Sequence, residues 1–178
     1  WSFDKLKNAT LSRSHRSGVA VKKLQEVLDK SREILQIPND YLIGIVPASD
    51  TGAVEMAMWC LLGQRGVEVY SWENFGHDWN IDAGEQLPLK DKVLVKAEYG
   101  QLPDFSKSDS KNDIVFTWNG TTAGVRIKNT DWISDAREGL VICDATSAVF
   151  SMQMDWPKLD VVTYSWQKVL GSEAAHGM

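Results

Sequence analysis

Short apolar runs rich in branched residues recur along this chain and limit the folds it can adopt. Several of them are apolar throughout instead of alternating with polar residues, which indicates strands that are covered on both faces. The runs are YLIGIV, VEVYSW, KVLVKAEY, DIVFTW, LVICDA and LDVVTYSW. Because helical or loop segments lie between most of them, the pattern predicts an α/β domain with a mainly parallel sheet flanked by helices.

Two segments have helical spacing. Residues 18–37 carry apolar residues at helical intervals, and Pro38 follows, so we expect a helix that ends before this proline. Residues 49–62 come directly after the first apolar run. Ser49 and Asp50 are residue types that cap helix N-termini, and Gly63 is a natural stop, so a second helix is expected here.

Composition argues against several classes of protein. The 178 residues, 43% of them hydrophobic, suffice for one domain with a sizeable core. The net charge is −5 and the sequence has no Lys/Arg cluster, so no basic surface that would bind nucleic acid is expected. No apolar run approaches the about 18 residues of a membrane span. We see no signal peptide. Cys60 and Cys143 lie far apart in apolar stretches, where buried, reduced thiols are expected instead of a disulfide or metal site. The expected location is the cytoplasm.

Polar clusters follow several of the predicted strands. These clusters are PASDTG, NGTTAG, DATSA and SWQK. In a parallel sheet, ligands bind just beyond the carboxyl ends of the strands. One such cluster could be an ordinary turn, but four at equivalent positions predict a site.

Asp144 and Lys168 are the most informative pair in these clusters. Asp144 ends an apolar run, and a buried carboxylate needs a partner. The segment between the two residues has room for one crossover, so both side chains could face one pocket. The pair could be a plain ion pair. It could also serve pyridoxal 5'-phosphate, whose aldehyde forms a Schiff base with a lysine and whose ring nitrogen pairs with an aspartate.

The cluster ASDTG adds a phosphate cradle to this pair, because backbone N–H groups, hydroxyls and a helix N-terminus all favour an anion. With SHRS, PASDTGAVEMAMW, NGTTAGVR, DATSAVF and TYSWQKVLGSEAAHGM, the chain resembles the phosphoserine aminotransferases, a class V, fold-type I family that depends on pyridoxal phosphate. It is most similar to the branch with SDTGA in the phosphate loop. The resemblance covers nearly the whole chain.

The resemblance implies a role for individual residues of the cofactor site. Lys168 corresponds to the Schiff-base lysine and Asp144 to the partner of the ring nitrogen. Asp50 and Thr51 match the loop that binds the cofactor phosphate, and Gln167 matches a further phosphate contact.

Four more residues are implied with open alternatives. Phe75 matches the aromatic residue that stacks on the cofactor ring, but it could be core packing, and Trp72 and Trp79 lie close by. Thr121 matches a contact to the phenolic oxygen of the ring, or it is a turn residue. His15 and Arg16 match a substrate-binding pair that reaches into the neighbouring subunit of a homodimer, or they lie in a solvated loop.

The activity implied by the resemblance is transamination between small amino and 2-oxo acids. O-phospho-L-serine and 2-oxoglutarate would give 3-phosphohydroxypyruvate and L-glutamate in L-serine biosynthesis. Many family members carry an arginine where this chain has Thr51, which leaves the preferred amino donor open. Another class V reaction (serine–glyoxylate transamination or a desulfurase-type lyase) and a non-catalytic phosphate-binding module are the competing hypotheses.

Family members are longer than this chain, so we expect residues 1–178 to be part of the cofactor-binding large domain. An N-terminal segment and the C-terminal small domain would then lie outside it, together with the arginines that bind the substrate carboxylate.

Overall fold

The computed structural model describes residues 2–178, which form two compact units that divide between Gly44 and Ile45. The first unit holds a short 3-10 helix, Phe3–Leu6, and helix α1, Gly18–Leu35. The Ser17 side chain caps α1 by accepting a hydrogen bond from the Ala20 N–H. The helix ends where Gln36 adopts a left-handed conformation, two residues before Pro38, as the sequence predicted.

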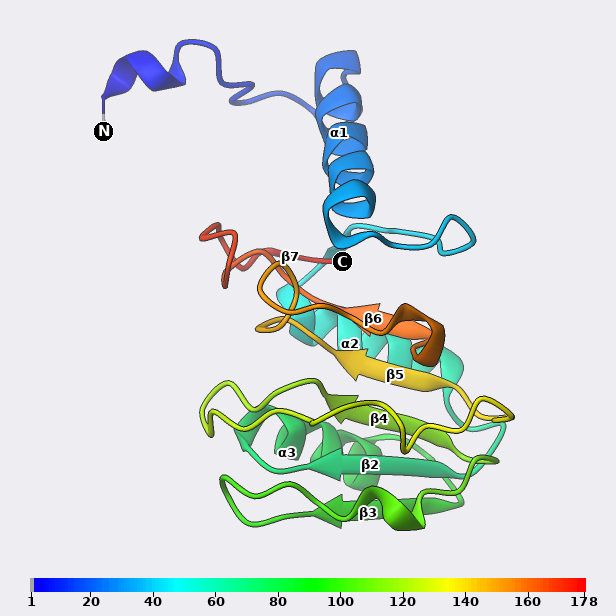
Figure 1. Ribbon diagram of the computed structural model, residues 1–178. Helices are drawn as coiled ribbons and strands as arrows, with labels where there is room; N and C mark the ends of the chain where they lie inside the picture. Colours follow the sequence, from blue (N-terminus) through cyan, green and yellow to red (C-terminus); the bar gives the residue numbers. More distant parts are fainter. Residues whose placement is uncertain (1) are drawn as a thin grey trace. The chain divides into compact units, whose positions relative to one another are not determined.

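The second unit is built on a five-stranded sheet in which every neighbouring pair is parallel (Figure 1). Its order is β3-β2-β4-β5-β6. The strands are β2 Val67–Ser71, β3 Lys92–Lys96, β4 Asp113–Thr117, β5 Val141–Asp144 and β6 Val161–Thr163. The α/β fold with a parallel sheet is therefore confirmed.

The first apolar run does not become the buried strand that we predicted. Only β1, Val46–Pro47, is a strand there, and it pairs antiparallel with β7, His176–Gly177. Leu42 is 99% exposed. The run does not enter the large sheet, and its last residue, Val46, pairs only with the short strand β7.

Helices α2, Ser49–Leu61, and α3, Asn74–Ile81, cover one face of the sheet, and a π-helix, Asp82–Gln86, continues α3 (Figure 1). Alternate strand residues point to the same face and meet these helices. The resulting core consists of Val54, Ala57, Met58, Trp79, Ala83 and Leu87 from the helical layer with Val67, Val69, Val115 and Ile142 from the strands. Each Val, Leu, Ile or Met side chain among them contributes about 1.5–3 kcal/mol when fully buried.

Loops and aromatic side chains cover the opposite face. Phe105, in the 3-10 helix Phe105–Lys107, stacks on Trp132 with ring centroids 4.4 Å apart, and both rings lie against Tyr70 of β2. Phe116 of β4 meets Trp132 edge-on. All residues of β2 and β4 are buried as a result, including the polar Glu68 and Ser71 of β2 and Asp113 and Thr117 of β4. No helix among residues 2–178 is long and apolar enough to cross a membrane.

Candidate active site

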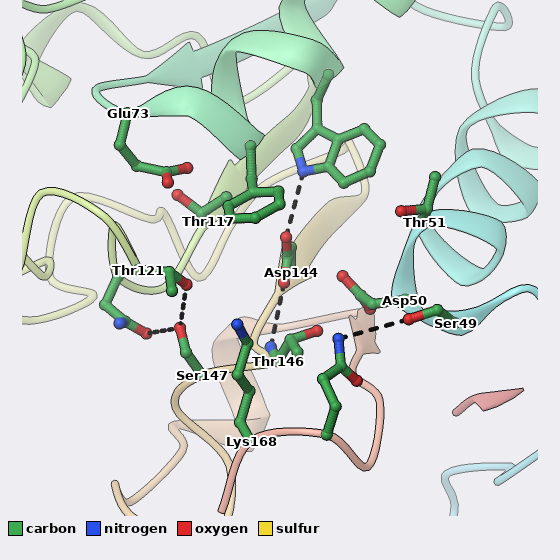
Figure 2. Close-up of a pocket in the computed structure, with 14 residues that line it drawn as sticks. Ser49, Asp50, Thr51, Glu73, Thr117, Thr121, Asp144, Thr146, Ser147 and Lys168 are labelled. Carbon is green, nitrogen blue, oxygen red and sulfur yellow. Dashed lines mark hydrogen bonds between the residues drawn. The ribbon is translucent and has the colours of Figure 1, made fainter. Parts of the chain in front are cut away.

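A pocket of about 430 Å³ lies where β4 and β5 end and α2 and α3 begin (Figure 2). Every cofactor-binding residue predicted from the sequence lines it. The lining residues are Ser49, Asp50, Thr51, Glu73, Phe75, Trp79, Thr117, Asn119, Thr121, Asp144, Thr146, Ser147, Gln167 and Lys168.

Asp144 is the last residue of β5 and points toward the helical layer, as Ile142 does two residues earlier. Its Oδ2 accepts a hydrogen bond from the Trp79 indole N–H at 3.2 Å. Its Oδ1 accepts one from the Thr146 backbone N–H at 3.1 Å. Both carboxylate oxygens are therefore held by donors, which fixes the carboxylate at the pocket wall (Figure 2).

Lys168 lies in the turn after β6, not at the end of a strand as we expected. The strand stops at Thr163 because the next residues pair elsewhere: Tyr164 bonds the backbone of Met178, and Ser165 bridges to Gly177. The Lys168 Nζ is 5.8 Å from the centroid of the Phe75 ring. Among the described residues no carboxylate lies within ion-pair distance of Lys168, so the plain ion pair with Asp144 is not formed.

The N-terminus of α2 is open toward the pocket, which differs from our expectation that Ser49 and Asp50 cap it. Ala48 is the N-cap residue, and no side chain caps the helix. Ala48 and Ser49 both have positive φ, 67° and 61°, and this tight turn carries the Ser49 hydroxyl to within 3.3 Å of the Ser165 hydroxyl. No acceptor in the described chain bonds the N–H groups of Asp50 and Thr51, which leaves two donors at the positive end of the helix.

Gly52 permits this turn. A Cβ at this position would lie 2.4 Å from the Pro47 carbonyl oxygen and 2.8 Å from the Ala48 Cβ. Only glycine therefore allows the chain to fold back so closely. On the other side of the opening, Gln167 Nε2 approaches the Ser49 hydroxyl at 3.5 Å (Figure 2).

The Asp50 side chain turns into the protein interior instead of capping the helix. It is only 6% exposed, and its Oδ1 has no hydrogen-bond partner among the described residues. Burial, and then the nearby charge of Asp144, raises the pKa of this carboxyl well above its usual range. The hydroxyls of Thr146 and Thr163 act in the opposite direction on the same pKa, although neither is in hydrogen-bond geometry.

The remaining wall carries an aromatic ring and hydroxyl groups. Phe75 is 43% exposed, so it is not a core residue. The Thr121 and Ser147 hydroxyls lie 2.8 Å apart, and the Ser147 hydroxyl donates to Asn119 Oδ1. The Thr117 hydroxyl is buried without a partner in the described chain.

Several pocket residues were not identified individually from the sequence. Trp79 entered only as an alternative for ring stacking, and nothing pointed to Glu73 or Thr117. Thr146 and Ser147 belong to the cluster DATSA, so the position of that cluster after a strand was the signal that could have found them.

His15 and Arg16 belong to the first compact unit, in the exposed segment that precedes α1. Their role in substrate binding stays a prediction.

The two cysteines differ in their environments. Cys143 is buried on β5, as expected, and burial raises the pKa of its thiol. Cys60 is exposed, contrary to our expectation, because it lies on the outward side of α2 beside Trp59. Neither cysteine lines the pocket.

Sequence comparison gives two close relatives of this chain. It is 57% identical over all 178 residues to the phosphoserine aminotransferases of Methanosarcina barkeri and Methanosarcina mazei. It covers 48% of each of these proteins, so the chain spans about half the length of the curated relatives it matches. No protein-family model matches the chain.

Solved structures give the same fold. The phosphoserine aminotransferase of Cytophaga hutchinsonii superposes with a TM-score of 0.74 at 25% identity, over 93% of this chain and 46% of that one. The ureidoglycine–glyoxylate aminotransferase of Bacillus subtilis gives a TM-score of 0.78 at 15% identity, over 95% of this chain and 46% of that one. Over its whole length this chain is thus similar to about half of a phosphoserine aminotransferase, and its fold is that of the class V aminotransferases.

Proposed function

We propose that this chain forms the pyridoxal-phosphate-binding part of a transaminase that interconverts O-phospho-L-serine and 2-oxoglutarate with 3-phosphohydroxypyruvate and L-glutamate. The observation that carries the proposal is the single pocket that joins Lys168, the donor-held carboxylate of Asp144 and the open N-terminus of α2. The name of the relatives that match the whole chain supplies phosphoserine as the amino donor, and the other three compounds follow from the resemblance to the family. The reaction would serve L-serine biosynthesis.

The groups in the pocket fit pyridoxal phosphate. The N–H groups of Asp50 and Thr51 have no acceptor in the described chain, and they lie at the positive end of a helix, where a phosphate is favoured. The Ser49 hydroxyl and Gln167 Nε2 flank this opening. The buried Thr117 hydroxyl at the pocket wall also lacks a hydrogen-bond partner in the described chain, so it is available to bond a ligand.

Pyridoxal phosphate supplies an aldehyde that condenses with amines and a protonated pyridine ring that accepts electrons from the substrate. Asp144, held by Trp79 and the Thr146 N–H, would keep the proton on the ring nitrogen. Lys168 would hold the aldehyde carbon and, once freed by the amino substrate, would take the proton from the substrate α-carbon as a general base. Phe75 would lie against the ring, and Thr121 would bond the ring hydroxyl.

Substrate binding requires cations that the pocket lacks. Lys168 is the one cationic residue among its lining residues, whereas phosphoserine carries a carboxylate and a phosphate. We assign His15 and Arg16 of a second copy to part of this role, because a guanidinium suits both anions, and we expect the arginines that bind the substrate carboxylate outside residues 1–178. The active enzyme would then be a homodimer, and the cytoplasm its location.

A glyoxylate aminotransferase is the second candidate, and Thr51 is the residue that favours it. Thr51 replaces the arginine that many phosphoserine aminotransferases carry, and proteins named as glyoxylate aminotransferases share the fold. A desulfurase is less suited, because neither cysteine lines the pocket.

Borohydride trapping tests the proposal directly. We expect the purified protein to turn yellow with pyridoxal phosphate and, after reduction, to keep a pyridoxyl group on Lys168 that peptide mass spectrometry can locate. Lys168→Ala is the matched variant and should carry no adduct, while Lys158→Ala, outside the pocket, should label normally. A non-catalytic phosphate-binding module would give phosphate-competitive binding without an adduct, and that result would refute the proposal.

A further inference from the structure

The pocket contains three acidic residues, and Asp50 is the exception among them. Asp144 receives a donor at each oxygen. Glu73 likewise receives the Gly76 N–H at 2.7 Å and the Thr122 hydroxyl at 3.3 Å. Asp50 is 6% exposed, and its Oδ1 has no hydrogen-bond partner among the described residues. Of the three carboxylates, Asp50 is therefore the one whose ionised form lacks a hydrogen-bond donor in the described chain.

No cationic side chain in the described chain pairs with Asp50 to compensate for this burial, and the only charge there that favours its ionised form is the partial positive charge of the α2 N-terminus. On β5 its charged neighbour is the Asp144 carboxylate, and the Cys143 thiol of the same strand lies close enough that its pKa is raised not only by burial and by Asp144 but also by the charge of Asp50. The other groups that act on Asp50 are uncharged: the hydroxyl of Thr163 on β6 and that of Thr146 in the segment after β5. Lys168 is the one cation that lines the pocket, and it makes no ion pair with a described carboxylate.

Two carboxylates in one desolvated site ionise together only at a high cost, so one of them keeps its proton. The donors at Asp144 stabilise its charged form, whereas an unpaired charge on Asp50 would remain uncompensated. The upward shift of the pKa of Asp50, caused by burial and by Asp144, agrees with this geometry.

We propose that Asp50 is a positioning residue: a neutral carboxylic acid that leaves Asp144 as the single negative charge at the inner end of the pocket. A neutral Asp50 also leaves the partial positive charge of the α2 N-terminus available to an anion, which an ionised side chain at the second helical position would offset. The protonation state concerns the ligand-free protein, and only its benefit to cofactor binding rests on the proposed function.

Stability as a function of pH provides the first test. Between the pKa of Asp50 in the unfolded chain, about 3.9, and its raised value in the folded protein, the folded state binds more protons, so stability falls as pH rises. Asp50→Asn cannot lose a proton. We expect the unfolding constant of the wild type, divided by that of Asp50→Asn, to rise by up to about tenfold per pH unit above about pH 4.

The matched control is Glu55→Gln, which neutralises an exposed carboxylate on the same helix and should follow the wild type at every pH. Denaturant unfolding of the ligand-free protein from pH 4 to 8 gives the three curves. Parallel curves for the wild type and Asp50→Asn would overturn the inference.

Infrared spectroscopy provides a second test that needs no pH series. The wild type at neutral pH should show the C=O stretch of a protonated carboxyl group, and Asp50→Asn should lack it. If Asp50→Asn does not fold, Asp144→Asn replaces it: removal of the neighbouring charge should shift the Asp50 titration, followed by carboxyl ¹³C resonances, to lower pH. An ionised Asp50 at neutral pH refutes the inference. Since both readouts use ligand-free protein, a failure to bind pyridoxal phosphate leaves them unaffected.

Discussion

Asp144 owes its orientation to two donors of different kinds. The Thr146 N–H belongs to the backbone, so most substitutions at that position would retain it. The Trp79 indole N–H comes from α3 and can be removed alone. A hydrogen bond to the ionised form of a carboxyl group favours that form. Trp79 therefore supports the charge on which the proposed contact with the ring nitrogen depends.

Trp79→Phe should weaken cofactor binding while the fold persists. The substitution keeps an aromatic ring in the core and removes one hydrogen bond to a charged group, which costs about 1.5–3 kcal/mol, or at least about tenfold in affinity. Absorbance titration with pyridoxal phosphate measures the change. Trp59→Phe, at an exposed position of α2, is the control. Equal affinities of the two variants would show that the indole donor is not needed.

The residue types of the site could be predicted from the sequence, but not their partners. Asp144, Thr121 and Gln167 follow strands or lie beyond them, and parallel strands bring such positions to one edge. The donor role of Trp79 depends on how α3 lies on the sheet, which no local pattern encodes. The inward turn of Asp50 depends on the left-handed conformation of Ala48 and Ser49, which sequence statistics place at glycine.

Helix α2 links the pocket to the end of the described chain. The Ala175 carbonyl accepts hydrogen bonds from the Ala48 and Ser49 N–H groups, and β7 pairs with β1. Gly177 lies so close that a Cβ there would be 2.3 Å from the Ser49 carbonyl oxygen. The turn that opens the helix N-terminus is thus held by residues far away in sequence.

Gly52→Ala should destabilise this arrangement. The added methyl group would collide with the Pro47 carbonyl oxygen at 2.4 Å, and overpacking of this kind costs about 1–3 kcal/mol. Gly18→Ala is the matched control, because nothing lies within 4 Å of a Cβ at that helical position. Denaturant unfolding should separate the two variants. A Gly52→Ala protein as stable as Gly18→Ala would mean that the close approach is not required.

Elements that the local hydrophobic pattern marks were the predictable ones, including α1 and β3, which remain largely exposed. The strands of the large sheet and helices α1 and α2 occur where the periodicity placed them. The prediction of a buried strand over YLIGIV was wrong, since an apolar composition alone does not decide which strand a segment pairs with, and only Val46 of this run pairs, with β7. The aromatic layer of Phe105 and Trp132 could not be predicted either, because its two residues come from loops and meet only in the folded chain.

At the scale of the whole molecule, the pocket offers the groups that the proposed cofactor needs but lacks the cations that the proposed substrate needs. The lining residues supply a lysine, an oriented carboxylate and an open helix N-terminus, yet no arginine. The relatives that match the chain are about twice as long as the part it covers, since it spans 48% of each. When this chain is studied alone, it should therefore keep cofactor binding but lose most of the turnover.

We expect the 178-residue chain to bind pyridoxal phosphate but to transaminate phosphoserine very slowly. The amine and the carboxylate that the chemistry needs are present, whereas the cations that would hold the substrate carboxylate and phosphate do not line the pocket. Oriented binding of a substrate contributes about 7–11 kcal/mol to catalysis in favourable cases, so its loss should dominate the rate. Glutamate formation from phosphoserine and 2-oxoglutarate, compared with a full-length relative at equal cofactor occupancy, measures the difference. Rates that match the relative would show that residues 1–178 already contain the substrate contacts, and would direct attention to His15 and Arg16 as their source.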